Sequence, residues 1–361
     1  MGQDGTRIFA LSRKNSIVNE SMKKRVLITG VTGQDGSYLA EHLFDLGYEV
    51  WGLVRRTSLD PHMRIDSLTK NKNIRIVYGN LRDGATLRDA VEKSRPDEIY
   101  NLAAQSDVRI SFDCPDETRE VNYYGLDRLI QEALRVNPSV RIYQASTSEM
   151  FGKTLPPQNE QSVLQPVSPY GEAKLLAHEN LVKGYREKLG LYICSGFLFN
   201  HESPRRGGNF VTRKITTSLA RVKLGQIENF DLGNLEALRD WGYAGDYVKA
   251  MHLMLQQDKP EDYVIATGVS HSVRDFVEAA AHALDMSICW EGVGIDEIGK
   301  DSNGRTIIKI SKEFYRPVEV DYLLGDSSKA LAKLGWSPGV TFEGLAEMMA
   351  KADYERLSKF S

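Results

Sequence analysis

Tyr170 and Lys174 have the residue types and the spacing that most directly suggest chemistry. They lie four positions apart after Ser168 and Pro169, which suit the cap and the first position of a helix. Positions i and i+4 share one helix face, so the Lys174 ammonium is expected to lie near the Tyr170 hydroxyl and to lower its pKa. The pattern predicts a tyrosinate that takes a proton from an alcohol during oxidation. The alternative is a surface pair with no chemical role.

A second reactive group is expected just before this helix, in the segment Gln144–Glu149. We expect a strand over 140–147, and in a strand positions i and i+2 share one face. Thr147 and Glu149 are therefore expected to point at the substrate together. The Thr147 hydroxyl suits a hydrogen bond to a sugar hydroxyl, and the Glu149 carboxylate could remove a proton from a carbon beside a ketone. A solvated carboxylate at a strand end is the alternative for Glu149.

A glycine-rich segment, Thr29-Gly30-Val31-Thr32-Gly33-Gln34-Asp35-Gly36, follows the first expected strand and opens the first expected helix. Its glycines permit a tight turn and close approach to a pyrophosphate, and the helix N-terminus offers free N–H groups. The pattern predicts a dinucleotide site. Its expected contacts are Gly30, Thr32, Gly33, Gln34, Asp35 and Gly36.

The end of the second expected strand indicates which dinucleotide binds. An NAD enzyme has Asp or Glu there, whereas this chain has Arg55, Arg56 and, shortly after, Ser58. Guanidinium groups pair with a 2′-phosphate, so NADP is predicted; a solvated basic loop is the alternative. Further cofactor contacts are expected after the third and fourth strands, at Asn80, Leu81, Leu102, Ala103, Ala104, Gln105 and Ser106.

The elements that must position these residues alternate between apolar strands and amphipathic helices, which predicts a parallel sheet covered on both faces. The expected fold is α/β, a Rossmann-type doubly wound parallel sheet with a smaller mixed α/β C-terminal substrate lobe. We expect strands at 26–29, 49–54, 74–78, 98–103, 140–147 and 191–199. Helices are expected at 38–46, 87–93, 117–136, 169–189, 273–284 and 342–356.

Domain limits follow from a change of pattern after Phe199, where glycine and irregular segments increase. We expect an N-terminal extension over 1–22, without stable structure. An NADP-binding domain is expected over 23–200, with return segments near 240–266. The substrate lobe is expected over 201–239 and 267–361.

Composition excludes several classes of function. The 361 residues contain 46 Lys+Arg and 49 Asp+Glu, a net charge of −3, so charge gives no reason to expect binding to nucleic acid or a membrane. No apolar run approaches the ~20 residues of a membrane span. Three distant cysteines argue against a disulfide framework or a cysteine metal site. We therefore expect a cytoplasmic protein without a metal.

These motifs together resemble the extended short-chain dehydrogenase/reductase family and, within it, the GDP-mannose 4,6-dehydratases. The similarity runs from about Lys24 to the C-terminus. It is carried by TGVTGQDGSY at 29–38, YQASTSE at 143–149, FNHESPRRG at 199–207, FVTRK at 210–214, RDWG at 239–242, YVIATG at 263–268 and YRPVEVD at 315–321.

The resemblance implies oxidation of C4 of GDP-mannose, elimination of water across C5 and C6, and return of the hydride to C6, with NADP recycled. Thr147, Glu149, Tyr170 and Lys174 would be catalytic. Lys174, His201 and Arg206 would join the cofactor site. The substrate surface would comprise Ser106, Thr147, Glu149, Tyr170, Asn200, Glu202, Arg205, Phe210, Val211, Lys214, Gly233, Arg239, Arg316 and Glu319.

Other functions stay open at this point. A GDP-heptose 4,6-dehydratase needs only more room near C6. A UDP-glucuronate decarboxylase also has a Thr-x-Glu strand and a YxxxK helix, but it generally prefers NAD, which Arg55 and Arg56 oppose. A non-catalytic NADP-binding subunit would not need the four catalytic residues. The resemblance further implies a homo-oligomer, a dimer or, as we expect, a tetramer, and a place in GDP-fucose biosynthesis.

Overall fold

The computed structural model describes residues 23–58, 60, 62–71, 73–314 and 322–359. The expected extension over 1–22 lies outside these residues. Within the described residues, no helix combines the length and the apolar content that crossing a membrane requires.

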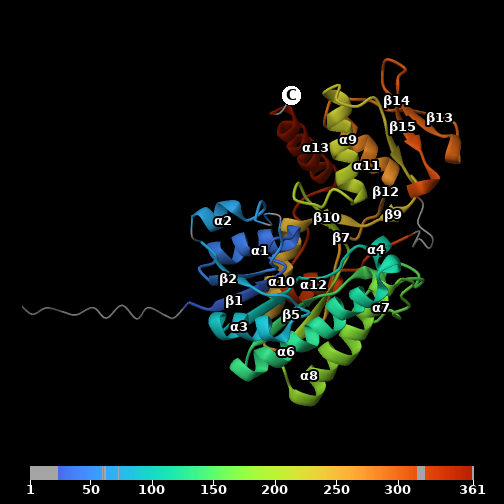
Figure 1. Ribbon diagram of the computed structural model, residues 1–361. Coiled ribbons are helices and arrows are strands. Elements are labelled where there is room, and N and C mark those ends of the chain that lie inside the picture. Colours follow the sequence, from blue (N-terminus) through green and yellow to red (C-terminus); the bar gives the residue numbers. More distant parts are fainter. Residues whose placement is uncertain (1–22, 59, 61, 72, 315–321, 360–361) are drawn as a thin grey trace, which may run out of the picture.

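A seven-stranded sheet forms the centre of the larger part of the molecule (Figure 1), and every neighbouring pair of its strands is parallel. Its order is β11-β6-β5-β4-β1-β2-β3, so the order reverses between β1 and β4. The carboxyl ends of strands at such a reversal border the ligand site in doubly wound folds. The strands are β1 (Arg25–Thr29), β2 (Glu49–Val54), β3 (Arg75–Tyr78), β4 (Glu98–Asn101), β5 (Arg141–Ala145), β6 (Ile193–Leu198) and β11 (Tyr263–Ile265).

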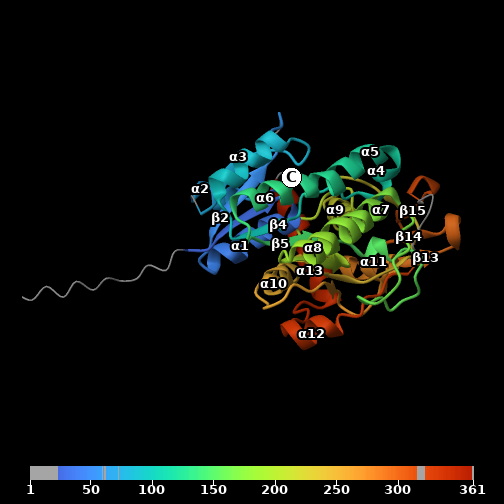
Figure 2. The same ribbon diagram turned by 90° about the horizontal axis from the view of Figure 1, so that it is seen from below.

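Helices cover both faces of this sheet, which confirms the predicted doubly wound α/β class. One face carries α1 (Gln34–Asp45), α2 (Asp66–Lys70), α10 (Ala244–Leu255) and α12 (Ser328–Leu334). The other carries α3 (Gly84–Ser94), α6 (Gly125–Val136) and the continuous helical run α7 (Pro169–Leu176), η3 (Ala177–Lys183) and α8 (Gly184–Leu189). Figure 2 shows α3 and α6 side by side. Two short helices, α4 (Val108–Asp113) and α5 (Pro115–Arg119), and the turn η1 (Glu120–Tyr124) precede α6.

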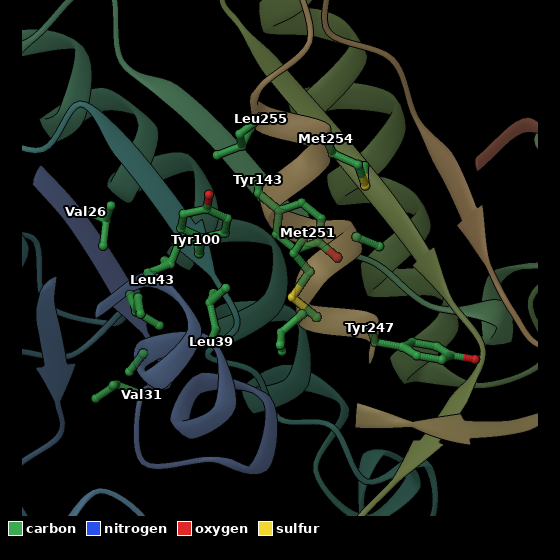
Figure 3. Packing of buried hydrophobic residues seen from close by; sticks show 14 of the residues in the cluster. Val26, Val31, Leu39, Leu43, Tyr100, Tyr143, Tyr247, Met251, Met254 and Leu255 are labelled. Atoms are coloured by element: carbon green, nitrogen blue, oxygen red, sulfur yellow. The ribbon is translucent and has the colours of Figure 1, made fainter. Parts of the chain in front are cut away.

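The core on the α1 and α10 face contains aromatic side chains from the middle of the sheet. Tyr100 of β4 and Tyr143 of β5 lie next to Met251 of α10 (Figure 3), and all three are fully buried. Because helices cover both sides, the strands are apolar on both faces, and β6 is buried along its whole length. Burial on this scale holds the strand ends, and thus the site, in fixed positions.

A second lobe packs helices against a four-stranded mixed sheet, as predicted for the C-terminal part (Figure 1). Its helices are α9 (Val211–Lys223), α11 (Val273–His282) and α13 (Phe342–Ser358), and its strands are β8 (Phe230–Leu232), β13 (Cys289–Glu291), β14 (Ile298–Lys300) and β15 (Thr306–Ile310). Two short pairs, β7 (Asn200–Glu202) with β10 (Trp241–Tyr243) and β9 (Leu238–Arg239) with β12 (His271–Ser272), join the lobes. The remaining short turns are η2 (Ser148–Met150), η4 (Gly294–Asp296) and η5 (Lys312–Phe314).

The structure differs from the sequence expectations at several elements. The helix expected from Tyr38 begins at Gln34, because its first turn is built from the glycine-rich segment. The strand expected over 140–147 ends at Ala145. Helices α9 and α10 were not predicted. The domain limits stay a prediction: α12, which the sequence placed with the substrate lobe, packs beside α10 and β11.

Candidate active site

The glycine-rich segment forms a tight turn between β1 and α1. Gly30 has φ +70°, and a Cβ built on it would lie 2.7 Å from the backbone nitrogen of Ala103. Gly33 is the N-cap of α1, and no side chain caps this end of the helix. The N–H groups of the first turn thus have no side-chain acceptor, and a helix end of this kind accepts an anion. The cradle fits the pyrophosphate of a dinucleotide.

Side chains from β7 and the following loop hold the start of α1. The Gln34 Nε2 donates to the His201 carbonyl oxygen at 3.0 Å, and the Ser203 hydroxyl donates to Gln34 Oε1 at 2.8 Å. His201 Nε2 lies 2.8 Å from Asp35 Oδ2. Arg64, which the sequence reasoning missed, donates to the carbonyl oxygen of Thr32 at 3.2 Å. The phosphate-binding turn is therefore braced by segments far away in the sequence.

Asp35 and His201 form a charge pair at this helix end. Burial alone would lower the pKa of His201, but the Asp35 carboxylate raises it above its usual value. Burial would raise the pKa of Asp35, but the charge of His201, and hydrogen bonds from His201 and Gln34, hold it below its usual value. Each partner thus favours the ionised form of the other.

The residues expected to select the cofactor lie at the ends of β2 and β3. Arg55, Arg56 and Ser58 are exposed, and the Arg56 guanidinium stacks 4.6 Å above the ring of Tyr78. Leu81 is buried, and Asn80 caps the following turn by accepting a hydrogen bond from the Arg82 backbone at 3.0 Å. Both guanidinium groups remain accessible to a phosphate from solvent.

The segment after β4 runs beside the glycine-rich turn. The backbone nitrogens of Leu102 and Ala103 both donate to the Thr29 hydroxyl at 3.1 Å. Gln105 is held by Asn122, which accepts from its backbone nitrogen at 3.1 Å, while the buried Oε1 of Gln105 has no protein partner. Ala104 is half-buried and Ser106 exposed. An orphaned acceptor beside the phosphate turn is consistent with a ligand at this edge.

Tyr170, Thr147 and Lys174 come together where β5 ends and α7 begins. All three are buried, with 8%, 7% and 3% of their surface exposed. Ser168 caps α7 by accepting from the Gly171 backbone at 3.1 Å, which places Tyr170 in the first turn. The Lys174 ammonium donates to the Ala145 carbonyl at 2.7 Å and lies 5.9 Å from the centre of the Tyr170 ring.

Thr147 and Glu149 are not on one strand face, so that sequence expectation is wrong. Because β5 ends at Ala145, Glu149 lies in the turn η2, and Thr147 is the N-cap of that turn. The Thr147 hydroxyl accepts a hydrogen bond from the Glu149 backbone nitrogen at 3.2 Å. Glu149 is half-buried and close enough to Tyr170 for its charge to act on that phenol. The capped turn η2, rather than the alternation of side chains along a strand, brings Thr147 and Glu149 close together.

The expected lowering of the Tyr170 pKa is also not observed. Burial raises the pKa of Tyr170 to about 12, the Glu149 charge adds to this, and a hydrogen bond with Thr147 and the charge of Arg206 oppose it. Burial lowers the pKa of Lys174 to about 8. Burial removes Lys174 from water together with Tyr170, so the ammonium charge does not outweigh the effect of burial on the Tyr170 pKa. Further positive charge is needed to make Tyr170 a base near neutral pH.

The segment after β6 supplies mainly internal contacts. The buried Glu202 carboxylate accepts from the Thr212 hydroxyl at 2.6 Å and pairs with Arg206 at 3.0 Å. Arg206 also stacks 3.6 Å above the ring of Phe210. Arg205 turns towards α1, where it pairs with Glu41 at 2.8 Å.

Two buried polar atoms of this segment make no hydrogen bond, Asn200 Oδ1 and Arg206 Nε. Arg206 is nevertheless held by its ion pair with Glu202. Asn200 thus has an acceptor available for a ligand.

The remaining expected substrate contacts lie in the second lobe. Arg239, in β9, is buried. The Lys214 ammonium lies 3.1 Å from the centre of the Phe314 ring, and a Cβ on Gly233 would lie 2.6 Å from the Phe314 carbonyl oxygen. Val211 begins α9 and is half-buried. Arg316 and Glu319 lie outside the described residues.

Two polar contacts near the site were missed. Asn209 donates to Asp107 at 2.5 Å and so joins the two lobes. The fully buried Asp240 accepts from the backbone nitrogens of Thr267 at 2.8 Å and Gly268 at 3.0 Å. Asp240 was not predicted, although its place in the RDWG segment was a signal for it, whereas nothing in the sequence indicated Asn209. The described residues hold no group of three or more His, Cys, Asp and Glu side chains placed for a metal ion.

The sequence matches the family model described as GDP-mannose 4,6 dehydratase over residues 27–349. The GDP-mannose 4,6 dehydratase of Homo sapiens is 50% identical over 339 residues, 91% of either chain. That of Drosophila melanogaster is 49% identical over 351 residues, covering 94% of this chain and 88% of the relative. The enzyme of Vibrio cholerae is 46% identical over 352 residues, with 92% and 94% covered.

Solved structures share the fold at lower identity. The UDP-glucose 4-epimerase of Thermotoga maritima superimposes with a TM-score of 0.77 and 23% identity, covering 92% of this chain and 99% of that one. The dTDP-glucose 4,6-dehydratase of Bacillus anthracis, in complex with NAD, superimposes with a TM-score of 0.75 and 20% identity. The match covers 93% of this chain and 98% of that one. RMD from Pseudomonas aeruginosa, in complex with NADPH, superimposes with a TM-score of 0.72 and 19% identity. The match covers 92% of this chain and 100% of that one.

Proposed function

The chain belongs to the GDP-mannose 4,6-dehydratase family, and we propose from this that it converts GDP-D-mannose into GDP-4-keto-6-deoxy-D-mannose and water. The observation that carries the proposal is the burial of Tyr170, Thr147 and Lys174 beside Glu149, next to a glycine cradle suited to a dinucleotide. An oxidising site and a second base within reach are what an oxidation followed by an elimination requires.

Tyr170 takes the proton of the C4 hydroxyl, and Thr147 holds that oxygen by a hydrogen bond. When bound, NADP supplies a hydride acceptor at C4 and, later in the cycle, a hydride donor at C6. The ketone formed at C4 acidifies the neighbouring C5–H bond. Glu149 then removes the C5 proton and passes it to the C6 hydroxyl, which leaves as water. When hydride returns to C6, C5 takes a proton from solvent, and Tyr170 releases to solvent the proton that it took from the C4 hydroxyl. Because the hydride taken from C4 is returned to C6 of the same sugar, the reaction needs no external reductant.

Lys174 has a supporting role in this scheme. Its ammonium is fixed on the Ala145 carbonyl, at the point where β5 leads into the Thr147 turn. It holds the strand end against α7 and adds positive charge near Tyr170. Since burial raises the Tyr170 pKa to about 12, the full depression of that pKa requires the positive charge of the oxidised nicotinamide as well.

Two groups of residues support the cofactor and the substrate assignments. Arg55 and Arg56 are exposed where a 2′-phosphate would lie, which favours NADP over NAD. Asn200 has a buried oxygen without a protein partner and suits a sugar hydroxyl. We retain the other expected contacts as proposals, with Arg205 the least supported because it is engaged by Glu41.

The decisive experiment is incubation of the purified protein with GDP-mannose and no added cofactor, followed by NMR of the product. The proposal predicts a 6-deoxy-4-keto sugar nucleotide, multiple turnovers per protein and no net formation of NADPH. GDP-heptose serves as the comparison substrate. A protein that converts GDP-heptose but not GDP-mannose would contradict the proposal, as would a requirement for stoichiometric NADP.

We further propose a homotetramer in the cytoplasm, acting in GDP-fucose biosynthesis. Ile110 and Phe112 on α4 and Tyr124 in η1 are exposed apolar side chains, with 45%, 37% and 46% of their surface accessible, and burial of such side chains between copies would favour an oligomer. Light scattering on the purified protein tests the oligomer, and a monomeric mass would contradict it.

A further inference from the structure

Asp35 places a carboxylate where the proposed function requires an anion to bind. It lies in the first turn of α1, next to the N–H groups that form the pyrophosphate cradle. A negative charge a few ångströms from a phosphate repels it more strongly inside a protein than in water, because the effective dielectric constant is lower there. Unless another charge cancels it, this carboxylate works against cofactor binding.

His201 has the geometry to cancel this charge. Its Nδ1 lies 2.7 Å from the carbonyl oxygen of Phe199, and its Nε2 lies 2.8 Å from Asp35 Oδ2. A carbonyl and a carboxylate only accept hydrogen bonds, so both contacts form when both ring nitrogens carry protons. The ring also stacks on Tyr247 with centroids 4.7 Å apart, which fixes its plane. The arrangement is that of an imidazolium ion.

We propose that His201 is a positioning residue that acts through Asp35: its positive charge neutralises the carboxylate, so that the first turn of α1 accepts the pyrophosphate of the dinucleotide. The inference rests on the proposed function in one respect, that NADP is the dinucleotide. It adds one joint role of the two side chains to the contacts that each was expected to make with the cofactor.

The other groups that face the pair leave this balance intact. Arg206, in the loop after β7, is a further cation, and its charge lowers the pKa of both members, by less than they affect each other. Gln34 donates to Asp35 Oδ1 at 3.0 Å. Tyr247 of α10, whose pKa is raised well above its usual value by burial, stays neutral. Tyr143 of β5, whose pKa burial also raises, is neutral too.

The pair is also coupled to the catalytic tyrosine. Burial is the main reason for the high pKa of Tyr170, and the charge of Asp35 raises it further. Loss of the His201 charge would remove the largest charge that compensates Asp35 and leave only that of Arg206. The pH at which Tyr170 becomes a base would then rise. A purely structural role of His201 would not produce this shift.

The test is a double-mutant cycle on the full-length protein, read out as the dissociation constant of NADPH by fluorescence titration. His201→Gln removes the positive charge and should weaken binding roughly 10- to 100-fold. Asp35→Asn removes the negative charge and should leave binding within about threefold of wild type or tighten it. The double variant should match Asp35→Asn, because without the Asp35 carboxylate burial keeps His201 neutral, so that His201→Gln then removes no charge.

His252→Gln serves as the matched control, since His252 of α10 contacts Tyr48 at 3.1 Å and lies outside the proposed site. It should bind NADPH like wild type. A double variant that binds as weakly as His201→Gln would overturn the inference, because loss of charge balance would then not be the cause. Equal weakening by His252→Gln would also overturn it.

The pH dependence gives a second, independent readout. Binding of NADPH to wild type should weaken as the pH rises through the ionisation of His201, because neutral imidazole no longer cancels Asp35. Asp35→Asn should lose this dependence, and equal slopes in the two proteins would contradict the inference. These are binding measurements, so they stand even if GDP-mannose proves not to be the substrate.

Discussion

Replacing Gly30 by alanine tests whether close approach of the backbone, and not merely an unusual φ, builds the cofactor cradle. Gly30 has φ +70°, and the new Cβ would lie 2.7 Å from the Ala103 nitrogen and 2.9 Å from the Leu102 carbonyl carbon. The left-handed conformation costs an L residue about 1–2 kcal/mol, and crowding against backbone adds about 1–3 kcal/mol. We expect Gly30→Ala to lose about 2–5 kcal/mol of unfolding free energy.

The same substitution should also release the cofactor, because the turn can relieve the clash only by moving away from β4. Gly190→Ala is the matched control: Gly190 has φ +65°, but a Cβ added there would have no atom within 4 Å. It should lose only the conformational part, about 1–2 kcal/mol, and keep its NADP. Urea unfolding and the NADP content after gel filtration measure both effects. Equal losses in the two variants would refute the role of close approach.

Three further variants test the cofactor site, the catalytic lysine and the packing of the second lobe. Arg55→Ser with Arg56→Ser should weaken NADP binding roughly 10²- to 10⁴-fold, since each of the two charge-assisted contacts contributes ~1.5–3 kcal/mol, and leave NAD binding unchanged in a titration of both cofactors. Burial lowers the pKa of Lys174 to about 8, so the ammonium charge is lost as the pH rises through that value. The ratio of the wild-type kcat to the kcat of Lys174→Gln should therefore fall over the same pH interval. A ratio that does not change with pH would exclude a charge effect. Asp353 is fully buried and pairs with Arg213 at 2.7 Å, so Asp353→Ala should cost about 3–5 kcal/mol in urea unfolding; a loss below about 1 kcal/mol would contradict this.

Local patterns were sufficient to predict the framework of the larger lobe. The sheet is buried on both faces, so each of its strands has an apolar sequence, and these apolar strands alternate with helices along the chain. The helix that carries Tyr170 and Lys174 was predicted over 169–189, and the structure has one helical run over those residues. Gly190, with φ +65°, ends it. Short-range physics determines these features, so one sequence reveals them.

Interactions across long stretches of chain were not predictable. The turn that holds Glu149 depends on where β5 ends, which is set by its pairing with neighbouring strands. The contact of Arg205 with Glu41 joins residues 164 positions apart, and no periodicity signals such a partner. The pKa of Tyr170 was expected to fall and instead rises, because burial of the whole helix start outweighs one lysine. Long-range packing decided each of these outcomes.

Transfer of a label within the sugar tests the central claim most directly. GDP-mannose carrying deuterium at C4 is incubated with the protein in ordinary water, and the product is examined by NMR and mass spectrometry. We predict that the deuterium appears in the methyl group at C6 of the same product. A methyl group without deuterium, with the label lost to solvent or left on released cofactor, would contradict the proposed hydride return.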